Sequence, residues 1–437
     1  MPFLLNLVYL LALFILSPWL LYKFLTTGKY RRGLLRKFLG LVDLPAPNSP
    51  RIWFHGVSVG EIHLLRHVVA RFRQSHPNWE CVLSTTTDTG FDEARKHFPD
   101  LSVVYWPLDF SWAVRRALRR INPSLIVLAE GELWPNFLIA AKRRGIPVAV
   151  INGRLSPRSF RRYRRFGGLV RWLFGHVDLF AMQTADYAGH IRELGGAAER
   201  VKVTGSVKFD GVQTERANPR TQELRCLLGV ETDDLVWTVG STQPPEEEIA
   251  LDIFRRVKVE HPNLRLFLVP RQKDRFDEVA RLLERSNLPF VRRSALDPRT
   301  SILDPRSSVI LVDTIGELGA LWGLADIAYV GGSLDGRRGG QNMIEPAAYG
   351  AVVLFGPHVW NFRDTAARLV EAGAARQVAD AAALETALRQ LLDDADGRQR
   401  MGSAARQFVL RQQGATEHTV ALLDELLANR PGRMLAA

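Results

Sequence analysis

The segment Arg51-Ile52-Trp53-Phe54-His55-Gly56-Val57-Ser58-Val59-Gly60-Glu61 joins an apolar strand to an amphipathic helix. The helix is expected over residues 61–73, where apolar side chains recur every three to four positions. Small residues at Ser58 and Gly60 allow a ligand to approach backbone N–H groups at a helix N-terminus, where partial positive charge gathers. Glu61, in the first turn, is a candidate general base, and ordinary helix capping is the alternative that position alone favours.

Strand-like runs and amphipathic stretches continue to alternate along the chain, which is typical of parallel sheets covered by helices on both faces. Strands are expected at residues 52–54, 81–84, 103–106, 125–129, 148–152, 179–182 and 201–204, and helices at 91–97, 112–121 and 135–143. A second series of strands is expected at residues 235–239, 264–269, 309–312, 327–330 and 352–355. The polar stretch 210–220 between the two series is interpreted as a linker, and the alanine-rich stretch 372–387 as a surface helix.

The predicted fold class is therefore α/β, with two Rossmann-like domains in the glycosyltransferase-B (GT-B) architecture, which binds ligands at the carboxyl ends of its strands. A length of 437 residues, 46% of them hydrophobic and 24% charged, suits two globular domains. The net charge of +12 indicates an anionic partner, which could be nucleic acid, anionic lipid or a phosphorylated substrate. Two cysteines, Cys81 and Cys226, exclude a disulfide framework and a cysteine-rich metal site.

The N-terminus narrows the choice of partner. Residues 3–22 carry no charged side chain, and about 20 helical residues span a bilayer core of roughly 30 Å. A cleavable signal peptide is disfavoured because no Lys or Arg precedes the apolar run and no small-x-small cleavage site follows it. Residues 1–30 are therefore expected to be a retained membrane anchor, although Pro18 would also allow a helix that lies in the membrane interface.

Positive charge follows the anchor and recurs later in the chain. The basic residues Lys23, Lys29, Arg31, Arg32, Arg36 and Lys37 place the remainder of the chain on the cytoplasmic side of the inner membrane. Further on, residues 154–174 interleave seven arginines with aromatic and aliphatic residues, a pattern that suits anionic headgroups, a phosphorylated acceptor or RNA. The anchor, with no recognisable nucleic-acid motif, favours lipid over RNA and over a merely solvated helix. The arginines are Arg154, Arg158, Arg161, Arg162, Arg164, Arg165 and Arg171.

In the second series, four segments could form a nucleotide site. Gly240-Ser241-Thr242 closes a strand and can offer N–H groups and a hydroxyl to a phosphate, while Arg271, after Pro270, can grip one with a bidentate fork. Ile315-Gly316-Glu317 places a carboxylate suited to ribose hydroxyls at a helix start, and Asn342-Met343-Ile344-Glu345 offers amides for a pyrimidine edge. Helix capping is the alternative for both glutamates. No Asp-x-Asp follows a strand, so metal-independent chemistry is expected.

In the first series, Glu130 and Glu132 follow the strand at residues 125–129 and so share a sheet edge with Glu61. Lys208 follows the strand at residues 201–204. A catalytic role for these groups competes with a simple structural Glu–Lys ion pair.

Together these segments resemble, in identity and order, the transferases of 3-deoxy-D-manno-octulosonic acid (Kdo), which move this acidic sugar from CMP-Kdo onto a lipid A precursor. The resemblance rests on His55 to Glu61, Glu130-Gly131-Glu132-Leu133-Trp134-Pro135-Asn136, Gly205-Ser206-Val207-Lys208-Phe209-Asp210, Gly240-Ser241-Thr242, Pro270-Arg271, and Gly331-Gly332-Ser333-Leu334 with Gly339-Gly340-Gln341-Asn342. It implies that Glu130 and Lys208 support the transition state. It also implies that CMP contacts Pro270, Arg271, Ile315, Gly316, Glu317, Asn342, Met343, Ile344 and Glu345.

Two positions depart from the family pattern: Gln272 stands where a His usually follows the arginine, and Gly131 where Thr is usual. The expected reaction is inverting transfer of Kdo to a glucosamine hydroxyl of the lipid A precursor (lipid IVA), with Glu61 as base. Residues 31–212 would bind the acceptor, and residues 213–437, C-terminal helices included, the CMP-sugar. No cofactor, metal ion or nucleic acid is required, and the number of Kdo residues added stays open. The alternatives are a GT-B transferase or epimerase that uses a UDP-sugar, and a non-catalytic scaffold for lipid A precursors.

Overall fold

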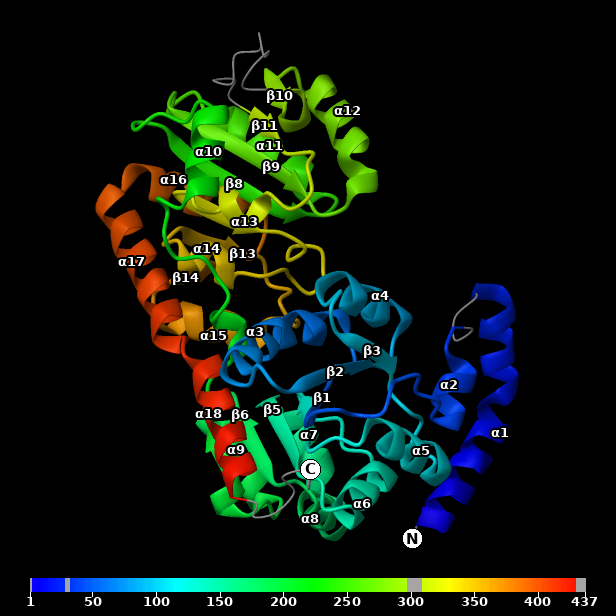
Figure 1. The fold of residues 1–437 in the computed structure, drawn as a ribbon. Coiled ribbons are helices and arrows are strands. Elements are labelled where there is room, and N and C mark those ends of the chain that lie inside the picture. The colour runs from blue at the N-terminus through cyan, green and yellow to red at the C-terminus, as the bar shows by residue number, and fades with distance from the viewer. Residues whose placement is uncertain (1, 28–31, 297–308, 430–437) are drawn as a thin grey trace. The chain divides into compact units, whose positions relative to one another are not determined.

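The computed structural model describes residues 2–27, 32–296 and 309–429, which form two compact α/β units (Figure 1). Unit 1 comprises Met1–Gly211 and the stretch from Gln413 onward, and unit 2 comprises Val212–Gln412. Each unit is built on one seven-stranded parallel sheet covered by helices. The predicted fold class is confirmed.

The sheet of unit 1 has the strand order β3-β2-β1-β4-β5-β6-β7. The order reverses between β1 and β4, so the loops that follow these two strands flank the crevice where doubly wound folds bind ligands. Its strands are β1 (Arg51–His55), β2 (Glu80–Thr85), β3 (Ser102–Tyr105), β4 (Leu125–Ala129), β5 (Val148–Gly153), β6 (Leu179–Met182) and β7 (Val201–Val203).

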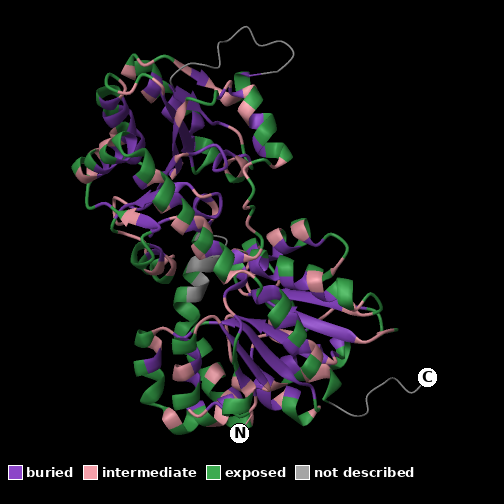
Figure 2. Ribbon diagram, turned by 90° about the vertical axis from the view of Figure 1, so that its left-hand side faces the viewer, coloured by how far each residue is buried: buried purple, intermediate pink, exposed green. Residues whose placement is uncertain are grey.

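Helices cover both faces of this sheet. Successive residues of β1 place large apolar side chains on opposite faces, and both faces must therefore be covered. Trp53 points to one face, where its ring lies 5.0 Å from that of Trp106 and 5.4 Å from that of Phe137, while Phe54 packs against Phe72 on the other. The strands are buried throughout the sheet centre (Figure 2). The helices are α2 (Leu34–Leu39), α3 (Val59–Ser75), α4 (Asp88–His97), α5 (Ser111–Ile121), α6 (Pro135–Arg143), α7 (Pro157–Arg164), α8 (Gly167–Phe174), α9 (Ala185–Glu193) and α18 (Ala415–Ala428), with 3-10 turns η1 (Ala198–Arg200) and η2 (Val207–Phe209).

The chain returns to unit 1 at its C-terminal end. Helix α18 packs on α3, where Arg71 and Glu417 lie 2.6 Å apart, and Asp210 accepts hydrogen bonds from the backbone N–H groups of Gly414 and Thr416. Gly211 lies close to His67, because a Cβ there would be 2.0 Å from the His67 imidazole and the exposed ring would have to move. The sequence had suggested that every C-terminal helix belongs with the second domain, and the structure instead groups α18 with unit 1.

The sheet of unit 2 has the order β10-β11-β9-β8-β12-β13-β14 and reverses between β8 and β12. Its strands are β8 (Leu235–Thr242), β9 (Leu264–Pro270), β10 (Phe290–Arg292), β11 (Val309–Leu311), β12 (Ile327–Val330), β13 (Val352–Phe355) and β14 (Ala375–Gln377). The helices are α10 (Pro219–Leu227), α11 (Glu246–Val257), α12 (Phe276–Ser286), α13 (Leu318–Leu321), α14 (Ile344–Ala348), α15 (Arg363–Glu371), α16 (Ala381–Asp393) and α17 (Ala395–Gln412), with 3-10 turns η3 (Lys273–Arg275) and η4 (Arg293–Ala295).

The stretch 210–220, predicted as the linker between the two domains, contains the boundary between the units, which falls between Gly211 and Val212. Beyond that boundary it is attached to unit 2, because Arg216 donates to the carbonyls of Tyr349 and Ala325 and Asn218 caps α10. One prediction for unit 2 is wrong in detail. The stretch 372–387 is not one surface helix, because residues 375–377 form the edge strand β14 beside β13 and the helix begins only at Ala381.

Helix α1 (Pro2–Thr27) contains an 18-residue window, Pro2–Trp19, long and apolar enough to cross a membrane. Its N-terminal half nevertheless carries a polar contact with unit 1. Asn6 exchanges hydrogen bonds with the backbone N–H (2.9 Å) and hydroxyl (2.7 Å) of Ser111 and accepts one from Asn136 (3.1 Å). The Tyr9 hydroxyl donates to Asp109, 2.9 Å away. The opposite side of α1 is exposed and apolar, with Phe3 86% and Phe14 77% accessible.

Candidate functional site

Glu61 lies in the first turn of α3, in the loop that follows β1. Its carboxylate accepts hydrogen bonds from the Val57 backbone N–H at 2.8 Å and from the Ser58 hydroxyl at 3.0 Å, while the Ser58 hydroxyl oxygen caps the Glu61 backbone N–H. This arrangement is a variant of the capping box, in which the Glu61 carboxylate accepts the N–H of Val57, the residue before the N-cap Ser58. The cap holds the side chain in one place and leaves it partly accessible to a ligand.

Burial raises the pKa of Glu61 above its usual range, and the nearby carboxylates of Glu130 and Glu132 raise it further. The hydrogen bonds from Val57 and Ser58 oppose that shift. A carboxylate whose proton affinity is raised is a better general base near neutral pH than an ordinary surface glutamate.

Glu130 follows β4, so it lies across the reversal of strand order from Glu61. Its backbone adopts the left-handed conformation (φ 57°), and Gly131 follows at φ 103°, where a glycine is favoured. Its carboxylate lies 3.4 Å from the Lys208 ammonium, which is carried by η2. The structure therefore brings together in unit 1 Glu61, Glu130 and Lys208, the three residues predicted to be catalytic, and Glu132 is also close enough to act on Glu61.

Asn152, at the end of β5, was not predicted as a functional residue. It is fully buried with φ 50°, its amide N–H lies 3.4 Å from the Glu130 carboxylate, and its amide oxygen accepts the Val207 backbone N–H at 3.1 Å. It thus ties Glu130 to the turn that carries Lys208. The sequence signal was an Asn at a strand end, directly before a glycine, where left-handed conformations concentrate.

In unit 2, the loops after β8 and β12 are joined by one buried carboxylate. Glu246, at the start of α11, accepts hydrogen bonds from the backbone N–H of Gln243 and from those of residues 332–334, and also from the Tyr329 hydroxyl at 3.0 Å. Burial raises the pKa of Glu246 against these hydrogen bonds, which lower it. Glu246 is therefore a structural brace for the glycine-rich loop, a role that the sequence reading missed.

A second group of polar side chains gathers around Glu345. The Asn342 amide donates to this carboxylate at 2.9 Å, the Trp322 indole also hydrogen-bonds it, and the Arg271 guanidinium is close enough to lower its pKa. Burial is the larger influence and raises the pKa of Glu345. Pro270 ends β9 and Arg271 is exposed at that edge, so the structure brings Arg271, Asn342 and Glu345 together.

The other predicted nucleotide contacts are placed differently. Met343 and Ile344 are buried, so only their backbone groups are available to a ligand. The Glu317 carboxylate is already engaged by Arg220 at 2.6 Å, by Arg293 at 2.8 Å and by the Thr314 hydroxyl. Ile315 is 69% exposed and Gly316 has φ 90°, so this loop presents its backbone rather than the Glu317 side chain.

The basic and aromatic stretch forms α7 and α8. All seven of its arginines are exposed, and none of them forms an ion pair with a described residue. Phe166 and Leu169 are 60% and 55% exposed beside them, while Phe160 and Phe174 are buried and attach the two helices to the unit. The basic residues near the end of α1 and after it are different. Arg32 pairs with Asp92 and Lys37 with Asp88, and Arg36 is exposed. Lys29, Arg31 and the Lys23 side chain lie outside the described residues.

Known proteins with similar sequences belong to one family. A family model for 3-deoxy-D-manno-octulosonic-acid transferase (kdotransferase) matches residues 30–211. A 3-deoxy-D-manno-octulosonic acid transferase of Haemophilus influenzae is 33% identical over 403 residues, 91% of this chain and 92% of the relative. Another, of Bordetella pertussis, is 35% identical over 394 residues, 88% of this chain and 89% of the relative. This chain belongs to the Kdo transferase family. It is an enzyme, a glycosyltransferase.

Solved structures agree on the fold. A putative UDP-N-acetylglucosamine 2-epimerase from Listeria monocytogenes matches with a TM-score of 0.59 over 87% of this chain and 98% of that one, at 12% identity. At that identity the likeness shows the fold alone. It supports the two-domain GT-B class that the strand pattern predicted.

Proposed function

We propose that this Kdo transferase moves Kdo from CMP-Kdo to a glucosamine hydroxyl of a lipid A precursor, with inversion and without a metal ion. The observation that carries the proposal is the Glu61 carboxylate, fixed by Val57 and Ser58 and lying across the strand-order reversal from the Glu130–Lys208 pair. Family membership supplies the transferred sugar, and the chemistry of these residues supplies the roles.

Glu61 accepts the proton of the acceptor hydroxyl as that oxygen attacks the anomeric carbon of Kdo. The bond from this carbon to the phosphate oxygen breaks as the new glycosidic bond forms, and CMP departs from the opposite face with the electron pair. One displacement with a single base inverts the configuration. Lys208, oriented by Glu130, is a fixed cation for negative charge on the reacting sugar.

The CMP group is assigned to the cluster around Glu345 in unit 2. Arg271 offers a charged fork to the phosphate, and Asn342 and Glu345 offer an amide and a carboxylate to base and ribose. The loop at residues 315–317 contributes backbone N–H groups, while the Glu317 carboxylate, already bound by two arginines, holds that loop in shape.

For the membrane we propose a monotopic attachment to the inner leaflet. A helix that crossed the bilayer would carry Asn6 and Tyr9 into the hydrocarbon core, yet both side chains are hydrogen-bonded to Ser111 and Asp109 of unit 1. The exposed apolar side of α1 and the basic, apolar surface of α7 and α8 suit an interface with anionic lipid.

Flotation on anionic vesicles tests this attachment. Replacing Arg161, Arg162, Arg164 and Arg165 together by Gln is expected to weaken binding at low salt, at about 1 kcal/mol per basic residue near the surface. If this variant floats like the parent at both low and high salt, the basic stretch does not bind the membrane and is a solvent-exposed pair of helices.

The reaction itself is tested by incubating the purified full-length protein with lipid IVA and CMP-Kdo and weighing the lipid product. A mass gain of one or more Kdo units is expected, unchanged by EDTA, with NMR showing an inverted anomeric centre. CMP, and not UDP, should raise the melting temperature. If CMP-Kdo is not consumed at any enzyme concentration, the result would support the non-catalytic scaffold. If UDP raises the melting temperature and CMP does not, the result would support an enzyme that uses a UDP-sugar.

A further inference from the structure

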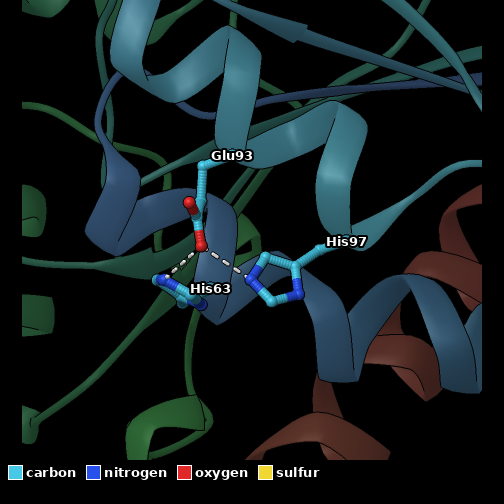
Figure 3. A group of neighbouring side chains, drawn as sticks. All are labelled: His63, Glu93 and His97. Atoms are coloured by element: carbon cyan, nitrogen blue, oxygen red, sulfur yellow. Dashed lines mark hydrogen bonds and ion pairs between the residues drawn. The ribbon is translucent and has the colours of Figure 1, made fainter. Parts of the chain in front are cut away.

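Two helices of unit 1 bring three side chains that can ligate a metal ion to one point. His63 lies on α3, and Glu93 and His97 lie one turn apart on α4 (Figure 3). The Glu93 Oε1 atom is 3.3 Å from His63 Nε2 and 2.7 Å from His97 Nε2. The ligand-type atoms of all three residues lie within 4.8 Å of one another.

The orientation of these groups suits a shared metal ion, because two imidazole nitrogens are directed at one carboxylate oxygen. The two imidazole rings meet edge to face, with centroids 4.9 Å apart and planes at 63°, so that both Nε2 atoms face the same carboxylate oxygen. Figure 3 shows the Glu93 carboxylate between the two rings. Two imidazole nitrogens and one carboxylate oxygen are a common three-ligand set for Zn²⁺, which fills its fourth position with water.

The surroundings set the strength of such a site. The side chains are 44%, 24% and 19% exposed for His63, Glu93 and His97, so an ion can enter from solvent. Arg66 and Lys96 are close enough to act on His63 and oppose a cation, which limits the expected affinity.

We propose that His63, Glu93 and His97 form a Zn²⁺ site that links helix α3 to helix α4. Because α3 begins with the Glu61 turn and α4 is capped by Thr87, whose hydroxyl bonds to the Val57 carbonyl, a metal link between them reinforces the framework of that turn. The ion would be structural, since the reaction proposed above draws on Glu61, Glu130 and Lys208.

The test uses the tag-free full-length protein in detergent with ZnCl₂ as the probe. We expect one Zn²⁺ per chain by titration calorimetry, a rise in melting temperature of about 5 °C at saturation, and a visible absorption band with Co²⁺ typical of tetrahedral N/O ligands. His63→Ala and Glu93→Gln should each weaken Zn²⁺ binding at least tenfold.

His418→Ala, which removes an exposed histidine elsewhere in unit 1, is the matched control and should bind like the parent. The His63 side chain is 44% exposed, so its replacement should leave the fold intact, and circular dichroism checks this. Absence of stoichiometric Zn²⁺ binding in the parent, or equal binding by the parent and His63→Ala, would overturn the proposal. Either result leaves the Kdo transfer reaction untouched, because that reaction is measured in EDTA.

Discussion

Replacement of Glu61 by Gln separates its two roles, base and helix cap. The Gln amide oxygen can still accept the Val57 N–H that the carboxylate accepts at 2.8 Å, so the capping box survives. Burial favours the uncharged form of Glu61, as its raised pKa shows, and Gln resembles that form. The free energy of unfolding at pH 7.5 should therefore change by less than about 1 kcal/mol.

Loss of the base should lower kcat by about 100-fold or more, or about 2.7 kcal/mol in the barrier, with CMP affinity unchanged. The assay is transfer of Kdo to detergent-dispersed lipid IVA, followed by mass spectrometry across pH 5 to 9. In the parent, the rate should fall as the pH drops through the Glu61 pKa, which lies above the usual glutamate range, and Glu61→Gln should lack this limb.

The matched control is Glu417→Gln, which changes the first-turn glutamate of α18, paired with Arg71 in the same unit. Its rate should equal that of the parent. A Glu61→Gln enzyme that is folded, saturated with both substrates and still within tenfold of the parent would reduce Glu61 to a helix cap.

Three further changes address other parts of the molecule. Arg271→Ala and Glu345→Ala should each weaken CMP binding by about 1.5–3 kcal/mol in titration calorimetry, and Arg281→Ala on the exposed side of α12 should not. Asn152→Gly relieves the positive φ but removes the bonds to Glu130 and η2, so kcat should fall about tenfold while calorimetry shows unchanged CMP affinity. Burial raises the pKa of Asp109 to about 6, so the stability tied to its protonated form is complete below about pH 4 and is lost as the pH rises through about 6. In urea unfolding, the free energy of unfolding of the parent should fall between pH 4.5 and pH 7.5 by about 3 kcal/mol at most. Asp109→Asn should not show this fall.

The strands that the sequence located best are those buried on both faces. Leu125–Ala129, Leu179–Met182, Ile327–Val330 and Val352–Phe355 have the predicted bounds because a central parallel strand is a continuous apolar run. The edge strands Phe290–Arg292 and Ala375–Gln377 were missed, since each has three residues of which only one is buried, and this gives no such run.

The return of the chain to unit 1 could not be predicted either. Helix α18 is amphipathic, and its apolar face fits any sheet-covering position that lies within reach of the chain. Its place is decided by contacts distant in sequence, above all those of Asp210 with Gly414 and Thr416. No local pattern encodes such pairings.

The candidate base was visible in the sequence, but the geometry that makes Glu130 useful was not. Its φ of 57° is a conformation that non-glycine residues adopt at a cost of about 1–3 kcal/mol, and such residues persist only where their surroundings hold them. Asn152 does this from the end of the neighbouring strand β5, and Lys208 does so from the turn η2 that follows β7. Gly131, at φ 103°, lets the chain leave the turn without a Cβ in that region. Gly131 therefore relaxes the backbone directly after Glu130. The carboxylate stays aimed by its side-chain partners, and this is why loss of Asn152 should lower kcat even though Asn152 itself touches no reacting atom.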